Sequence, residues 1–443
     1  MGNGRVVLVA STFALLLAAT ASAQQPFNIT APVTSLATLF TDLYGPQGLV
    51  LDSQATLPNE QPHYAHYNSD FQQDFGQFST ALVSQLVSVP LPSPVGGFTY
   101  EFDATLGVFQ RTTRSFGPIL ADRAETVGAG RVSVGFTFQR FTFDTVEGMD
   151  LDRIPVVFTH DNAALLGGRE DVVTTLNSIQ ADVSQSTAFV TLGVTDRFDI
   201  SLAVPFVSTY LKVVSTATIH RLGTTNPLTH FFRQSDGTVG DSRTFTAVGD
   251  ASGIGDLMIR AKTQLYRGAT NGVAVGLDAR LPTGDEMNLL GTGAAGLQPF
   301  AIWSASFEKV APHVNVAYRW NGSSMLAGNP ALGESAPFPP QLAYAAGVDI
   351  SANTRLTVTF DLLGRYVFDA ERLTPETFHA LDNRSEFPNI VFASDSFNNL
   401  SGAVGFKANL VQRLLIETNL LFALDDNGLR DKITPLVGLE YTF

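Results

Sequence analysis

Apolar and polar residues alternate along much of the second two-thirds of the chain. The last strand shows this most clearly: Val437, Leu439, Tyr441 and Phe443 are apolar, and Glu440 and Thr442 lie between them. A period of two predicts a β-strand whose two faces meet different surroundings. Alternation of this kind recurs in twelve segments, each about as long as a tilted membrane-spanning strand: 130–141, 187–195, 197–207, 255–265, 272–282, 297–308, 313–320, 341–350, 355–366, 400–409, 413–424 and 433–443.

The connections between these segments alternate between short and long. The short ones lie around Asp196 and at 266–271, 309–312, 351–354 and 411–412, and the long ones at 142–186, 208–254, 283–296, 321–340, 367–399 and 425–432. Short turns at one end and long loops at the other are typical of single-chain outer-membrane barrels. We therefore predict an all-β fold, a transmembrane antiparallel up-and-down β-barrel of twelve strands over residues 130–443, with both termini on the periplasmic side.

The N-terminal part follows a different pattern. Residues 1–23 predict a secretory signal peptide, with Arg5, an apolar core and the small residues Ala21-Ser22-Ala23 at the cleavage site. Residues 24–129 predict a periplasmic extension or a plug, with a β-hairpin near 98–111. If that hairpin joined the wall, the barrel would have fourteen strands.

The two faces of each predicted strand differ in charge. In 355–366, Val358 and Phe360 share one face and Thr359 and Asp361 the other, and the charged face must point into the lumen because hydrocarbon cannot solvate it. The lumen positions hold nine bases (Arg131, Arg260, Lys262, Arg280, Arg319, Arg355, Arg365, Lys407, Arg413) and eight acids (Asp199, Asp256, Asp278, Glu308, Asp349, Asp361, Glu417, Glu440).

This near balance allows two interpretations. The charges either brace a narrow barrel through ion pairs or line a transport path, for which the candidates are Arg260, Lys262, Asp278, Arg280, Arg319, Asp349, Asp361, Arg365, Lys407 and Glu417. Asp256 and Asp285 lie among glycines near the predicted extracellular rim, where they serve either turn formation or the selection of solutes.

Composition narrows the function. The chain is 44% hydrophobic with 33 Phe and 2 Trp, yet no apolar run after the N-terminus reaches the roughly 20 residues of a membrane helix. A net charge of −14 argues against nucleic-acid partners, and the absence of cysteine excludes disulfides and thiol chemistry. The expected partners are outer-membrane lipid and, for the C-terminal strand, the barrel assembly machinery.

Motifs for chemistry are weak. Residues 291–296 match the dinucleotide fingerprint Gly-x-Gly-x-x-Gly, but they lie between two predicted barrel strands and not inside a βαβ unit. His63 and His66 form an isolated His-x-x-His, and Asp241, Asp250 and Asp256 lack a calcium-loop spacing. No Gly-x-Ser-x-Gly occurs. We therefore expect no enzyme activity, cofactor or metal.

Several local signatures resemble a known family. In order, they are Thr191 to Asp199, Ala203-Val204-Pro205-Phe206, Gly253 to Leu257, Leu281 to Asp285, Gly291-Thr292-Gly293 and His313 to Arg319. This order resembles the transporter-like outer-membrane proteins of the "MetA pathway of phenol degradation". The resemblance covers about residues 187–320 plus the C-terminal strand. It implies a barrel in the bacterial outer membrane for uptake of aromatic or other hydrophobic compounds.

The long N-terminal part departs from that family and is similar to the plug-bearing fatty-acid and hydrocarbon channels. The function expected is therefore passive transport of small apolar or aromatic solutes. The alternative is a structural or surface-interaction barrel with a filled lumen and no transport.

Overall fold

The structure, a computed structural model, describes residues 35–44, 49–54, 100–103, 108–111, 115–159, 170–223, 225–233, 236–411 and 413–443. The predicted signal peptide and His63 and His66 lie outside the described residues. No helix in the described ranges is long and apolar enough to cross a membrane. The single helix there, α1 (Leu39–Asp42), has four residues.

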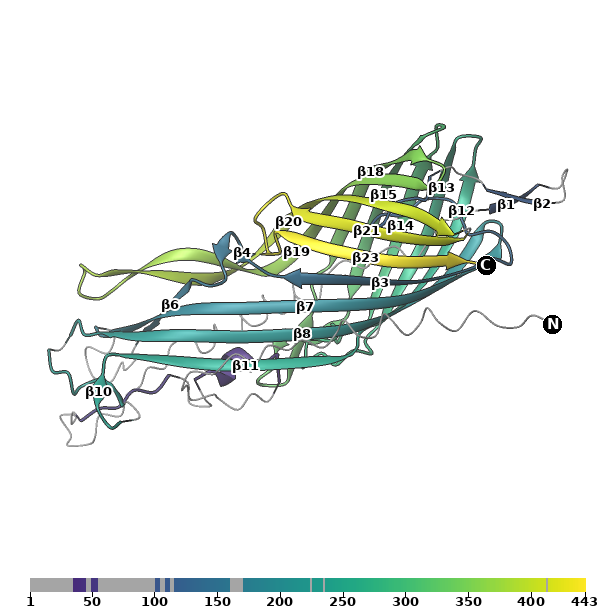
Figure 1. Ribbon diagram of the computed structural model, residues 1–443. Helices are drawn as coiled ribbons and strands as arrows, with labels where there is room; N and C mark the ends of the chain where they lie inside the picture. The colour runs from purple at the N-terminus through teal and green to yellow at the C-terminus, as the bar shows by residue number, and fades with distance from the viewer. Residues whose placement is uncertain are drawn as a thin grey trace.

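Among the described residues, twelve antiparallel strands close into a barrel, in which β8 pairs with both β7 and β12 (Figure 1). The predicted strand number is therefore confirmed. In order around the wall the strands are β3 (Val132–Thr142), β7 (Val172–Thr195), β8 (Phe198–His220), β12 (Leu257–Arg267), β13 (Asn271–Leu281), β14 (Gly296–Ala305), β15 (Val310–Asn321), β18 (Gln341–Asn353), β19 (Leu356–His379), β20 (Glu386–Val411), β21 (Leu414–Ala423) and β23 (Ile433–Thr442).

The other strands lie outside this ring. The predicted hairpin forms its own two-stranded sheet, β1 (Tyr100–Asp103) with β2 (Val108–Arg111), so the fourteen-stranded alternative is wrong. β6 (Ile154–Thr159) pairs with β7, and β11 (Ser242–Ile254) pairs with β8. Short pieces complete the loops: β4 (Thr145–Val146), β5 (Met149–Asp150), β9 (Phe232–Arg233), β10 (Val239–Gly240), β16 (Ser323–Asn329), β17 (Glu334–Pro337) and β22 (Leu429–Arg430).

An apolar belt surrounds the barrel. Outward-facing Phe136, Leu202, Phe360, Val404 and Leu439 are 37–47% exposed, although they sit in the middle of paired strands. Aromatic residues flank the belt: Trp320, Tyr318, Tyr366 and Phe368 contact one another at the long-loop end, and Tyr441 and Phe443 contact each other at the short-turn end. A continuous belt of exposed apolar side chains is stable only when lipid surrounds it. The aromatic rings then lie at the two boundaries between lipid and water.

Four strands rise well beyond this belt. β7, β8, β19 and β20 have 23 to 26 residues each, and Figure 1 shows them extending with β11 past the shorter strands. Much of the predicted long connections 142–186, 208–254 and 367–399 is therefore strand. The sequence pattern did not predict these strand extensions, because above the belt the apolar residues change from the outer to the inner face. There the outward positions are polar (Ser178, Gln180), and the inward ones, Ile179 and Leu211, are apolar and buried.

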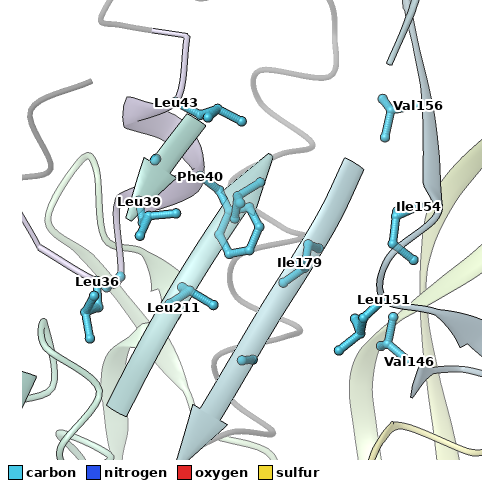
Figure 2. Close-up of a cluster of buried hydrophobic side chains, with 14 of the residues drawn as sticks. Leu36, Leu39, Phe40, Leu43, Val146, Leu151, Ile154, Val156, Ile179 and Leu211 are labelled. Atoms are coloured by element: carbon cyan, nitrogen blue, oxygen red, sulfur yellow. The ribbon is translucent and has the colours of Figure 1, made fainter. Parts of the chain in front are cut away.

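An apolar core fills the space inside this extension. Leu36, Leu39, Phe40 and Leu43 pack with inward side chains such as Leu211 in one buried cluster (Figure 2). Next to this cluster, Tyr44 donates or accepts a 2.6 Å hydrogen bond with Ser215, and burial raises the pKa of the Tyr44 phenol to about 12. The apolar side chains of residues 35–44 and 49–54 therefore complete a core at the long-loop end.

A buried contact between a carboxylate and a histidine holds one loop at the same end. The Asp171 carboxylate accepts hydrogen bonds from the backbone amides of Leu222 and Gly223, both at 2.8 Å, and contacts His230 Nδ1 at 2.8 Å. Burial alone would raise the pKa of Asp171, but the bonds from His230 and the two amides lower it. A lowered pKa stabilises the folded state above the unfolded pKa of about 4 and loses that contribution as the pH falls through the folded value.

We therefore expect proteolysis of the loop around residues 221–233 to be slow at pH 7 and pH 5 and to increase below about pH 4. Asp171→Asn should make the loop sensitive to the protease at pH 7, at pH 5 and below pH 4. Limited proteolysis of the detergent-solubilised barrel measures this, with a neutral protease at pH 7 and pH 5 and an acid-active protease below pH 4. Equal cleavage of both proteins at pH 7 would contradict the stabilising role.

Candidate functional site

Residues 115–129, called here the inner segment, lie inside the lumen near the short-turn end. Their amides donate to inward side chains of the wall: Phe116 to Thr357 Oγ1 at 3.0 Å, Ala124 to Ser304 Oγ at 3.0 Å and Val127 to Asp199 Oδ2 at 3.1 Å. Nearly every residue of the segment is buried. Polar lumen side chains thus satisfy the backbone of a chain that has no strand partner.

The inner segment approaches the wall closely where it leaves the lumen. At Gly193 a Cβ atom would lie 1.9 Å from the carbonyl oxygen of Gly128, and the amide of Gly130 donates to the Gly193 carbonyl at 2.8 Å. Gly128 and Gly130 themselves have φ values of 97° and 70°. Glycine is needed on both sides, because side chains would prevent either the contact or the backbone conformation.

Lys262 fixes the middle of the inner segment. Its ammonium donates to the carbonyl oxygens of Arg123 at 3.1 Å and Glu125 at 2.7 Å, and it lies 3.6 Å from the Asp122 carboxylate. The side chain is 1% exposed. A buried ammonium requires such partners, so Lys262 and the segment stabilise each other.

Arg260 joins the same segment to the wall. Its guanidinium donates to both carboxylate oxygens of Asp278, at 2.6 and 2.8 Å, and to Asp122 Oδ2 at 2.8 Å. The group also lies 4.7 Å from the ring centroid of Phe300. Asn315 exchanges two hydrogen bonds with the Asp122 backbone, at 2.6 and 2.8 Å. A bidentate arginine shared by two carboxylates is a strong, directional contact.

Two further groups of charged lumen residues contact one another, whereas Glu308, Arg355 and Arg413, also predicted to face the lumen, are exposed at the short turns. His313 Nε2 is 2.7 Å from Asp361, and its Nδ1 is 3.8 Å from Asp349, which accepts a 3.3 Å hydrogen bond from Ser115. Lys407 and Glu417 face each other at 3.1 Å. The residues of both groups are almost completely buried. These pairs occupy the lumen and leave little room for a solute beside them.

A cavity of about 210 Å³ lies inside the barrel, between the inner segment and the apolar core at the long-loop end. Leu120, Ala121 and Asp122 of the segment form part of its lining. The wall contributes charged and polar residues, Arg260, Asp278, Gln298, Arg319, Arg365 and Asn399, and apolar ones, Met258, Phe300, Ile302, Ala317, Ala343, Leu363 and Leu421. We call this space the central cavity.

Two smaller cavities share lining residues with the central cavity. One, of about 100 Å³, is lined by Phe141, Phe143, Phe338 and Phe397 and shares Arg365 with it. We call it the aromatic chamber. The other, of about 80 Å³, lies under Leu289 and Leu290 and shares Met258, Asp278, Gln298 and Arg319. The three cavities therefore lie next to one another within the lumen.

The predicted site residues fall into three groups. Arg260, Asp278, Arg319 and Arg365 line the central cavity, and Arg280 and Asp256 line the third cavity. Lys262 and Asp349 contact the inner segment, Lys407 contacts Glu417, and Asp361 contacts His313. Sequence reasoning missed Asp122, Phe300 and His313 as members of this site. Asp122 has no signal at all, because its stretch does not alternate.

The two predicted rim residues differ. Asp256 is buried, and its carboxylate accepts bonds from Thr292 N at 2.8 Å, Thr292 Oγ1 at 2.6 Å and Gly284 N at 3.1 Å. It therefore fixes the 282–295 loop. Asp285 is exposed and binds Asn288 in the same loop. Two of the fingerprint-like glycines, Gly291 and Gly293, belong to this loop too, and the third, Gly296, begins β14. In the described part of the chain, no group of three or more acidic, histidine or cysteine residues could hold a metal.

The fold and the lipid-facing belt define the class: this is a β-barrel protein of the bacterial outer membrane. The family model described as "Putative MetA-pathway of phenol degradation" matches residues 158–370, so the resemblance seen in the sequence is confirmed. No curated protein matches.

Solved structures of outer-membrane barrels are similar in part. The COG4313 outer membrane channel from Pseudomonas putida F1 is 14% identical, with a TM-score of 0.41 over 73% of this chain and 99% of that one. A Pseudomonas aeruginosa FadL homologue is 10% identical, with a TM-score of 0.29 over 71% and 89%. The CymD monoaromatic hydrocarbon channel is 8% identical, with a TM-score of 0.34 over the same shares.

Proposed function

We propose that this barrel is a passive channel for small hydrophobic or aromatic compounds, which cross without chemical change. The observation that carries this proposal is the row of three neighbouring cavities inside the lumen, the largest of about 210 Å³. A purely structural barrel has no need for internal spaces of this size, because protein interiors are otherwise closely packed. The matched family model, whose description refers to phenol degradation, agrees with an aromatic solute.

The aromatic chamber suits the capture of such compounds. Phe141 and Phe143 lie with ring centroids 5.9 Å apart and nearly parallel planes, and Phe338 and Phe397 complete the lining. Val367 and Leu429 add further apolar surface, and Arg365, Arg430 and Asp431 add charged groups at the edge of the same lining. An apolar solute leaving water gains roughly 25 cal/mol per Å² of surface buried against such walls.

The inner segment is the closing element in this proposal. It occupies the lumen between the central cavity and the short-turn end, and lumen side chains hold it by hydrogen bonds and ion pairs. Passage to the periplasm therefore requires that part of the segment moves.

Filling the central cavity should stop transport. Ala343 lies on β18 between Ala317 and Arg365, and all three line the central cavity. We expect Ala343→Trp to reduce uptake of radiolabelled toluene into proteoliposomes about 10-fold or more, because the indole occupies the solute's space. The matched control is Ala346→Trp on the same strand, where residue 346 is exposed on the lipid face.

If both variants transport toluene like the wild type, the central cavity is not on the path. The second candidate function, a filled structural barrel, is favoured by the extensive bonding of the inner segment. Planar-bilayer recordings separate the two: a silent barrel that also fails to admit toluene would support the structural role.

A further inference from the structure

The central cavity carries more positive than negative charge. Its described lining holds three arginines, Arg260, Arg319 and Arg365, and two carboxylates, Asp122 and Asp278. Both carboxylates are bound to Arg260. The net charge of the lining is thus 3 − 2 = +1, in a chain whose total is −14. The lining of the central cavity is therefore positively charged, whereas the chain as a whole is negatively charged.

Arg319 of β15 faces this space with a single side-chain hydrogen bond to the described part of the protein. Its Nε donates to Gln298 Oε1 at 2.7 Å, and no carboxylate among the described residues lies within ion-pair distance of it. Arg260 and Asp278 lie close enough to act on it electrostatically. A guanidinium has five donors, so four N–H groups of this cavity-lining arginine have no acceptor among the described residues.

Arg365 faces the same space from the other side of β18. Arg319 pairs in register with Gln341 of that strand, and Arg365 with Ala343, two residues further along. The two guanidiniums are near enough to repel each other. Two cations that face one cavity from adjacent positions are stabilised by an anion between them.

The remaining lining is apolar and of limited size. Phe300, Ile302, Leu363 and Leu421 contribute hydrophobic surface around the arginines. A cavity of about 150 Å³ with apolar walls can hold benzene, and the central cavity measures about 210 Å³. It therefore has room for one ring and a small charged group.

We propose that the central cavity binds small monocarboxylates with an apolar body, of which benzoate is the simplest aromatic example. The carboxylate lies between Arg319 and Arg365, and the ring lies against Phe300 and its apolar neighbours. A monoanion neutralises the single excess charge, whereas a dianion such as phosphate reverses it and leaves the apolar walls unused. This inference rests on the proposed channel function only for the route by which the ligand arrives.

Equilibrium dialysis of the detergent-solubilised full-length protein with radiolabelled benzoate, at low ionic strength, tests the proposal. Benzyl alcohol, a neutral ligand of similar size, is the comparison. We expect the wild type to prefer benzoate, and Arg319→Gln to weaken benzoate binding about 10-fold, as expected for loss of a hydrogen bond to a charged group. Arg365→Gln should act in the same direction. Benzyl alcohol binding should change less than about 2-fold, and it also shows that each variant retains its cavity.

Arg355→Gln is the matched control, because Arg355 is exposed at a short turn and should leave benzoate binding unchanged. Equal wild-type binding of benzoate and benzyl alcohol would overturn the proposal. So would benzoate binding that neither Arg319→Gln nor Arg365→Gln weakens.

Proteoliposome uptake of the same two compounds distinguishes this failure from failure of the channel function. Arginine-dependent binding of benzoate without any uptake would retain the ligand class and reject transport. Uptake of benzyl alcohol with no binding or uptake of benzoate would retain the channel and reject the ligand class.

Discussion

Val358→Arg is expected to prevent the barrel from assembling in the outer membrane. Val358 lies on β19 with Ile350 on one side and Phe406 on the other, and both neighbours belong to the exposed apolar belt. An arginine on the lipid face costs about 2–4 kcal/mol near the middle of the bilayer. The loss should appear as the absence of a heat-modifiable folded band when outer-membrane fractions are run on gels.

The matched control for this substitution lies on the same outer surface but above the lipid. Thr216 of β8 is exposed, pairs with Leu176 of β7 and Thr244 of β11, and belongs to the extension that rises past the belt. Thr216→Arg should therefore assemble normally, because water solvates its charge. Assembly of both variants to the wild-type level would show that lipid does not surround Val358.

The strand faces were predictable because the two-residue period is a local property of the chain. In β19, Thr357, Thr359 and Asp361 are buried toward the lumen, while Phe360 and Leu362 are more than 40% exposed, as the alternation predicts. A shift of one residue would exchange the two sets. Hydrocarbon tolerates no such exchange, so the sequence of a spanning strand has to record which side faces lipid.

The extension above the membrane was not predictable by the same rule. There Val183 and Ile179 of β7 point inward to the apolar core, while Gln180 and Ser184 point outward to water. The period is unchanged, but lipid no longer lies outside, so the pattern is that of an ordinary soluble sheet. A prediction that looks for apolar residues on the outer face therefore finds a strand only as far as lipid surrounds it.

The contacts of the lumen residues depended on distant parts of the chain. Arg260 was predicted as a lumen residue, yet one of its partners, Asp122, lies 138 positions earlier in a segment without strand pattern. The nearly equal numbers of acidic and basic residues predicted to face the lumen likewise did not indicate where in the lumen each charge lies. Pairs such as Lys407 with Glu417 are closed on themselves, and the excess cation gathers at the central cavity.

Lys262→Met is expected to open the channel at its short-turn end. The substitution keeps most of the apolar stem of the side chain but removes the ammonium that bonds to the carbonyl oxygens of Arg123 and Glu125. Hydrogen bonds to a charged group contribute about 1.5–3 kcal/mol each. A combined loss of about 3 kcal/mol would raise the ratio of displaced to seated inner segment roughly 100-fold. Planar-bilayer recordings should show larger or more frequent openings than the wild type.

The control for Lys262→Met is a lysine that does not contact the inner segment. Lys309→Met removes an exposed lysine at a short turn and should leave the recordings unchanged. The contact of Arg260 with Asp122 persists in Lys262→Met, so adding Asp122→Asn should increase the openings further. If Lys262→Met folds to a heat-modifiable barrel with wild-type conductance, alone and with Asp122→Asn, these bonds do not keep the lumen closed, and the inner segment is a fixed part of the wall.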